Sequence, residues 1–140
     1  MMQPLMATDP IRHLTGDPVA TILPSSTLRD AATELAADGI GLLVVVDPSG
    51  VRGVLSERDI VRAIAEGIDL DVERVRDVAS LDVQSVDENT SILDTARRMI
   101  DAEIRHIAVS RRDVVYDVVS IRDVLNVLVN DAAPASAAGR

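Results

Sequence analysis

The pattern of apolar and polar residues repeats once along the chain. When the sequence is shifted by 64 residues, positions 11–66 align with positions 75–130 without a gap, and 11 of the 56 pairs are identical. The apolar positions recur at the same spacing, in pairs that include Val19/Val83, Leu28/Ile92, Leu35/Met99, Val45/Val109 and Val54/Val118. One supersecondary unit is therefore predicted to occur twice.

Each repeat predicts a strand, a helix, two further strands and a final helix. The first repeat places the strands at 19–22, 40–46 and 51–55 and the final helix at 56–66. Its first helix follows the cap at Thr27, carries the apolar stripe Leu28, Ala31, Ala32 and Leu35, and ends near Gly39. The second repeat carries the counterpart helix stripe Ile92, Thr95, Ala96 and Met99, a hairpin turn at 111–113 that lacks glycine, and a final helix from Ser120 to about Val129. Thr27 with Asp30, and Ser91 with Asp94, predict capping boxes at the starts of the equivalent helices.

The repeat predicts where the chain divides. Residues 1–10 are expected to form a loose lead-in, 11–68 and 69–130 the two units, and 131–140 a disordered tail. One unit of about 55 residues would bury too little surface to be stable by itself. We therefore expect an α/β (α+β) fold in which two strand–helix–strand–strand–helix units, related by a pseudo-two-fold axis, pack sheet to sheet.

Composition narrows the possible functions. The chain has no Cys and only two His, which excludes thiol chemistry and leaves little scope for a metal site. The net charge of −9 disfavours nucleic acid and anionic membranes as partners. The longest apolar run, 40–46, has the length of a strand, and no signal peptide is visible, so we expect a soluble, cytoplasmic protein.

A seven-residue stretch occurs in both repeats, at 53–59 and 117–123. Ser56 precedes Asp59 by three residues, and Ser120 precedes Asp123 in the same way, at the predicted start of each final helix. This spacing is typical of helix caps. A helix start with an added hydroxyl group is also suited to bind phosphate. The two interpretations are compatible.

Each half resembles a CBS domain, and the whole chain resembles a stand-alone CBS pair, or Bateman module. In the first half the residues that carry the resemblance are 26–28, 31–32, 39–40, 43–47 and 50–60. In the second half they are 90–92, Ala96, 104–109 and 118–124. The resemblance implies two clefts between the halves that bind AMP, ADP, ATP or an adenosyl ligand such as S-adenosylmethionine. It also implies a homodimer formed through helices, and regulation of an unknown partner protein without catalysis.

The resemblance implies roles for particular residues. Ser56, Asp59, Ser120 and Asp123 match the family's Gly-x-x-[Ser/Thr]-x-x-Asp motif, in which the hydroxyl group lies near phosphate or ribose and the carboxylate binds the ribose. Asp117 departs from this motif because it replaces the glycine that is present at position 53. The other candidate ligand contacts are Thr21 and Ser85 for base or ribose, Arg105 and His106 for phosphate, and Ile40, Leu42 and Ile104 for an apolar slot around the base.

Plainer roles remain open for each of these candidates, such as an edge-strand hydroxyl, a solvated arginine or a core residue. Because Arg105 has no basic counterpart at position 41, we expect the second half to suit a phosphorylated ligand better. The alternative function is a dimerisation module that binds no ligand. An enzyme is disfavoured, because no nucleophile–base pair, carboxylate dyad or metal cluster recurs at suggestive spacing.

Overall fold

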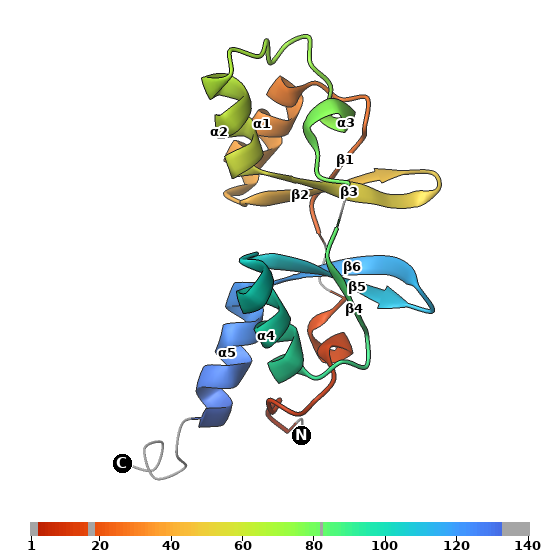
Figure 1. Cartoon of the computed structure of the whole chain (residues 1–140), viewed down its shortest axis with the longest axis vertical. Coiled ribbons are helices and arrows are strands. Elements are labelled where there is room, and N and C mark those ends of the chain that lie inside the picture. Colours follow the sequence, from red (N-terminus) through yellow and green to blue (C-terminus); the bar gives the residue numbers. More distant parts are fainter. Residues whose placement is uncertain (1–2, 17–18, 82, 133–140) are drawn as a thin grey trace. The chain divides into compact units, whose positions relative to one another are not determined.

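The computed structural model describes residues 3–16, 19–81 and 83–132. These residues form two compact units, each built around its own three-stranded sheet (Figure 1). The amino-terminal unit comprises the described residues within Pro18–Val83, and the carboxy-terminal unit comprises those within Met1–Asp17 and Gln84–Arg140. The α/β class and the repeated element order are as the sequence predicts.

The amino-terminal unit has the sheet order β1-β2-β3. Its elements are β1 (Thr21–Ile22), α1 (Leu28–Asp38), β2 (Leu42–Asp47), β3 (Gly50–Ser56), α2 (Glu57–Ala65) and α3 (Val75–Val78). The strand β1 runs parallel to β2, and β3 returns antiparallel to it. Helices α1 and α2 lie on one face of the sheet (Figure 1). The core between the helices and the sheet is centred on Leu28, Leu43 and Leu55, which are fully buried.

The carboxy-terminal unit has the sheet order β4-β5-β6, with the same directions. Its elements are η1 (Ile11–Leu14), β4 (Ser85–Asp87), α4 (Ile92–Ala102), β5 (His106–Arg111), β6 (Val114–Ser120) and α5 (Ile121–Ala132). The stripe Ile92, Thr95, Ala96 and Met99 is buried, as predicted. The hairpin turn without glycine forms because Arg112 and Asp113 adopt positive φ angles of 51° and 65°, the combination that a tight hairpin turn needs.

The structure corrects the predicted boundaries. Residues 3–10 are not a loose lead-in: Leu5 packs against the carboxy-terminal core, and the Asp9 carbonyl oxygen accepts a hydrogen bond from the Ile92 amide (2.8 Å). Likewise Val75, assigned to the second repeat, is fully buried in the amino-terminal core. Each repeat thus contributes its leading segment to the other compact unit, because those apolar side chains complete the other core.

The predicted tail at 131–140 begins inside α5, and its residues 133–140 lie outside the described residues. The Asp131 carboxylate accepts a hydrogen bond from the Ala7 amide (2.8 Å), which ties the end of α5 to the amino-terminal segment. Within the described ranges, no helix is long and apolar enough to cross a membrane.

Candidate functional site

The first serine–aspartate pair closes the start of α2. The Ser56 side chain accepts a hydrogen bond from the Asp59 amide (3.2 Å), and the Asp59 Oδ2 atom accepts one from the Ser56 amide (2.8 Å). Arg62 lies one turn further on, with its guanidinium 3.7 Å from Asp59 Oδ1. The Asp59 side chain is only 17% exposed. Its carboxylate is therefore already engaged as a reciprocal cap and in an ion pair.

The second pair has the same spacing but a different arrangement. Ser120 Oγ accepts a hydrogen bond from the Asp123 amide (3.2 Å). The Asp123 side chain is exposed, and among the described residues its carboxylate makes no hydrogen bond or ion pair. The two carboxylates therefore differ in their capacity to bind a ligand. Asp123 can accept hydrogen bonds from a ligand, whereas Asp59 would first have to break its hydrogen bond with the Ser56 amide.

Arg105 and His106 lie at the same end of the sheet as Ser120. His106 pairs with Ser120 across β5 and β6, and the Arg105 carbonyl oxygen accepts a hydrogen bond from the Ile121 amide at the start of α5 (2.7 Å). Burial lowers the pKa of His106, the Arg105 cation lowers it further, and the Asp123 carboxylate acts in the opposite direction. We call this group, Arg105, His106, Ser120 and Asp123, the α5 site.

The other candidates are placed elsewhere within their units. Thr21 and Ser85 lie on β1 and β4, at the sheet edges opposite the strands that carry Ser56 and Ser120. Ile40 and Ile104 pack against the cores, as the plainer interpretation expected, while Leu42 is half-buried beside Ser56. A base slot formed by these residues between the two halves stays a prediction.

A groove of about 230 Å³ adjoins the Ser56–Asp59 pair in the amino-terminal unit. Its lining comprises Asp59, Arg62, Ala63, Glu66, Ile68, Asp77 and Val78. Three carboxylates against one guanidinium make it unfavourable for a phosphate group. In the residues that the structure describes, no group of three or more His, Asp or Glu side chains is placed to hold a metal ion.

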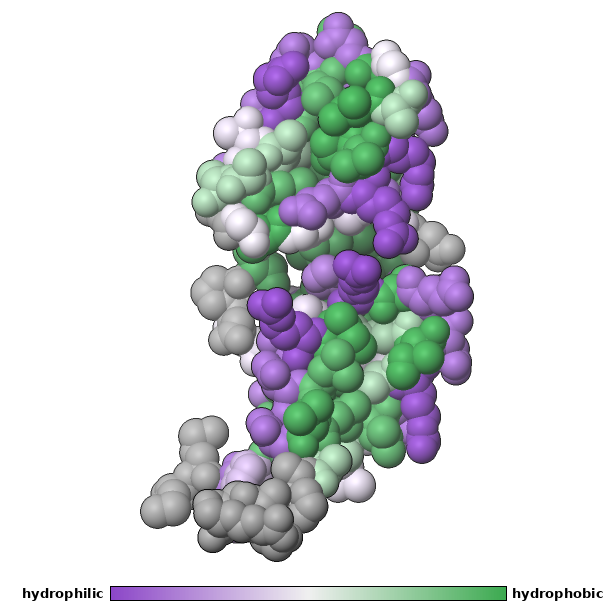
Figure 2. Space-filling view, turned by 90° about the vertical axis from the view of Figure 1, so that its left-hand side faces the viewer, coloured by the Kyte–Doolittle hydropathy of each residue, from purple (hydrophilic) through white to green (hydrophobic). Residues whose placement is uncertain are grey.

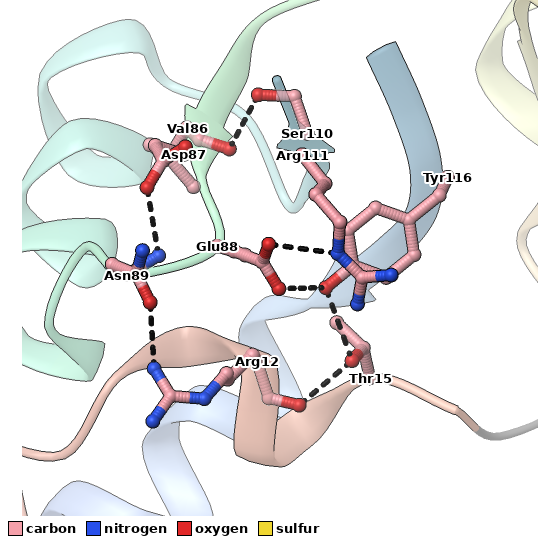
Figure 3. Close-up of polar contacts among 9 residues, drawn as sticks. All are labelled: Arg12, Thr15, Val86, Asp87, Glu88, Asn89, Ser110, Arg111 and Tyr116. Carbon is pink, nitrogen blue, oxygen red and sulfur yellow. Dashed lines mark hydrogen bonds and ion pairs between the residues drawn. The ribbon is translucent and has the colours of Figure 1, made fainter. Parts of the chain in front are cut away.

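Sequence reasoning missed a polar cluster around Glu88, which Figure 3 shows. The Glu88 side chain accepts hydrogen bonds from Arg111 Nε (2.8 Å) and from the Tyr116 hydroxyl (3.4 Å), and the Arg111 guanidinium lies over the Tyr116 ring, 4.7 Å from its centroid. The Glu88 carboxylate raises the pKa of Arg111. The cluster joins β5 and β6 to the segment that carries Arg12 and Thr15. The sequence signal that could have indicated this cluster is Arg111 in the hairpin turn, five residues before Tyr116, the one aromatic residue of the chain.

The comparisons with known proteins agree with this architecture. The model of the CBS-domain family matches residues 6–66 and 75–130, so the chain belongs to the CBS-domain family. An uncharacterised 17.7 kDa protein of Acidianus ambivalens is 33% identical over 128 residues, which are 89% of this chain and 76% of that protein. Proteins of this family are generally regulatory rather than catalytic.

Two solved structures illustrate the similarity. A CBS-domain protein from Agrobacterium tumefaciens is 27% identical and superimposes with a TM-score of 0.77 over 91% of this chain and 98% of that one. A CBS-domain protein from Pyrobaculum aerophilum, solved in complex with AMP, is 31% identical, with a TM-score of 0.71 over 81% of this chain and 88% of that one.

Proposed function

We propose that the protein is a regulatory module that senses an adenine nucleotide or a related adenosyl ligand at the α5 site. The observation that carries the proposal is the unengaged Asp123 carboxylate beside Ser120, at the start of a twelve-residue helix. Helix starts present free N–H groups and partial positive charge to a phosphate, and a carboxylate one turn further on can accept hydrogen bonds from ribose hydroxyl groups.

The charge around the α5 site supports a phosphorylated ligand. The chain as a whole carries −9 and repels anions, so an anion needs local compensation. Arg105 is exposed beside the start of α5, whereas the equivalent residue at the start of α2 is Gly41. The AMP complex of the Pyrobaculum relative makes AMP the first ligand to test. ADP and ATP share the phosphate and the ribose of AMP, whereas S-adenosylmethionine shares only the adenosyl group and would be bound through the ribose.

The test is a thermal-shift and calorimetric titration of the full chain with AMP, ADP, ATP, S-adenosylmethionine and adenosine. Ligand that binds only the folded state raises Tm. We expect Asp123→Ala to abolish the shift, and Arg105→Ala to weaken AMP binding about tenfold without weakening adenosine. Asp59→Ala is the matched control and keeps the AMP response. No shift with any ligand at millimolar concentration contradicts the proposal, as does an AMP response that depends on Asp59 instead of Asp123.

We further propose that the protein acts as a homodimer formed through its helices. The helices carry exposed apolar residues: Val61 and Ile64 on α2, Ile100 on α4, and Leu125 and Val129 on α5. Figure 2 shows hydrophobic surface on one side of each unit. Contiguous exposed apolar surface marks an interaction site. The same observation favours the second candidate function, a dimerisation module without a ligand.

Light scattering in solution tests the dimer. The wild-type chain is expected at twice its 15.0 kDa mass, and the double variant Leu125→Glu/Val129→Glu at the monomer mass. Val114→Glu, at an equally exposed apolar position on the β6 hairpin, is the control and keeps the dimer. A monomeric wild-type chain rules out the homodimer and, with it, the dimerisation module as the second candidate function. A dimer that responds to no ligand favours the second candidate function.

A further inference from the structure

In the amino-terminal unit, two backbone hydrogen bonds join Ser80 to Val54 on β3. The Val54 amide donates to the Ser80 carbonyl oxygen (3.1 Å), and the Ser80 amide donates to the Val54 carbonyl oxygen (2.9 Å). This close approach requires glycine at position 53, because a Cβ atom there would overlap the Ser80 carbonyl oxygen. We call this pair of hydrogen bonds the backbone bridge.

In the carboxy-terminal unit the repeat spacing of 64 residues places Gly16 at the position of Ser80, Asp117 at that of Gly53 and Val118 at that of Val54. Here one side chain takes the place of the backbone bridge. The Gly16 amide donates to Asp117 Oδ2 (2.8 Å), and the Val118 amide donates to Asp117 Oδ1 (2.8 Å). Among the described residues, no backbone hydrogen bond joins Gly16 to Val118. The two amide groups that form the bridge in one unit are thus both bound by a single carboxylate in the other.

The backbone at Gly16 explains the substitution. Gly16 has a φ angle of +107°, a conformation that side chains rarely adopt, and a Cβ atom there would meet nothing within 4 Å. Glycine is therefore required by the backbone angle and not by lack of space. With this turn the Gly16 amide bonds to the Asp117 carboxylate instead of to a backbone carbonyl oxygen. Asp117 stands at the position of the glycine in the other repeat, and its carboxylate binds the Gly16 and Val118 amides.

The segment before Gly16 is attached independently of Asp117. The Arg12 side chain donates to Asn89 Oδ1 (2.6 Å), the Arg12 amide to the Glu88 carbonyl oxygen (3.0 Å), and the Thr15 hydroxyl group lies 3.4 Å from the Tyr116 hydroxyl group (Figure 3). Residues 12–15 therefore have attachments that do not involve Asp117, and release of the Asp117 carboxylate would free the chain at Gly16.

We propose that Asp117 is a side-chain clasp that makes the chain at Gly16 a releasable hinge, whereas the equivalent point at Ser80 is fixed. One rotation of a half-buried carboxylate frees both amide groups to water, while the backbone bridge opens only if the main chain moves. The clasp lies where the chain passes from one compact unit to the other. The inference goes beyond the proposed ligand and does not depend on it.

The test is amide hydrogen exchange of the unliganded full chain, resolved by NMR and expressed as protection factors. In Asp117→Ala, we expect protection to fall at least tenfold at Gly16 and Val118 and to stay unchanged at Val54 and Ser80. Asp117→Asn keeps one carbonyl acceptor, so protection falls at one of the two amides. Asp113→Asn removes the same charge from the exposed hairpin turn and changes neither amide.

Two results overturn the clasp. The first is unchanged protection at Gly16 and Val118 in Asp117→Ala. The second is an equal fall at Val54 and Ser80, which would mean that the carboxylate stabilises the whole chain. The Arg12 and Thr15 amides, which donate to the Glu88 and Arg12 carbonyl oxygens, test the hinge separately. Their protection stays unchanged in Asp117→Ala if residues up to Thr15 remain attached, and a fall in their protection contradicts a hinge confined to Gly16.

Discussion

At the scale of single residues, equivalent positions of the repeat carry different side chains because they face different neighbours. Gly53 faces a backbone carbonyl oxygen at close range, and Asp117 faces an amide group that it binds. The sequence shows that Asp117 departs from the repeat and from the family's motif. The structure gives Asp117 its own hydrogen-bonding role.

Gly53→Ala is predicted to destabilise the amino-terminal unit. The new methyl group would overlap the Ser80 carbonyl oxygen and lie 3.3 Å from Leu81 Cδ2, so the backbone bridge must shift. Such overpacking costs about 1–3 kcal/mol of the free energy of unfolding. Denaturant unfolding measures the loss. Gly41→Ala is the control, because a Cβ atom there meets nothing within 4 Å. Equal stability of the two variants would contradict the close approach.

His106 is predicted to make stability depend on pH. Burial and Arg105 lower its folded-state pKa below the unfolded value of about 6.5, so the unfolded chain binds more protons in that range. The contribution of neutral His106 is fully present above pH 6.5 and is lost as the pH falls towards the folded-state pKa. Unfolding measured across this window should show stability rising with pH, and His106→Gln should flatten the slope of stability against pH. An unchanged slope in His106→Gln contradicts the prediction.

At the scale of elements, four helices begin with a hydroxyl group followed three residues later by an aspartate. In all four the hydroxyl group accepts a hydrogen bond from the aspartate amide. The reciprocal bond from the carboxylate forms at Thr27 and Ser56 but is absent at Ser91 and Ser120 in the described structure. The spacing predicts the cap, and the surroundings of each carboxylate decide whether the box is complete.

Asp59→Ala is predicted to destabilise the chain more than Asp123→Ala. The Asp59 carboxylate caps the Ser56 amide, and losing a cap costs about 1 kcal/mol. Asp123 contributes only its favourable charge at the helix start, about 0.3 kcal/mol. Denaturant unfolding of the two variants without ligand measures the difference. A larger loss for Asp123→Ala would mean that its carboxylate is engaged, and would also weaken the proposed ligand site.

At the scale of the whole molecule, the repeats and the compact units do not coincide. The sequence repeat begins at residue 11, but Ile11 is fully buried in the carboxy-terminal core, 75 residues or more from its packing partners Val86 to Val127. Val75 occupies the equivalent position in the amino-terminal core. Periodicity assigns a residue to an element and a buried face. It does not say which of two similar cores receives that face.

Ile11→Ala is predicted to destabilise the carboxy-terminal unit. Removing a fully buried side chain of this size costs about 2–5 kcal/mol. Hydrogen exchange should therefore rise across α4, β5, β6 and α5, and stay unchanged in α1 to α3. Val75→Ala is the matched variant: hydrogen exchange should rise in the amino-terminal unit and stay unchanged in the carboxy-terminal unit. Faster exchange in the amino-terminal unit of Ile11→Ala would restore the division at residues 11 and 69.

The sequence by itself determined the repeated element order, the buried stripes, the helix starts and the two serine–aspartate pairs. These depend on short-range spacing, which backbone geometry translates directly into faces and caps. Only the tertiary structure decided that the leading segments are exchanged between the units, that Asp59 is engaged while Asp123 is not, and that Asp117 binds the Gly16 amide. Each of these depends on contacts between residues far apart in the chain, whose partners no local pattern specifies.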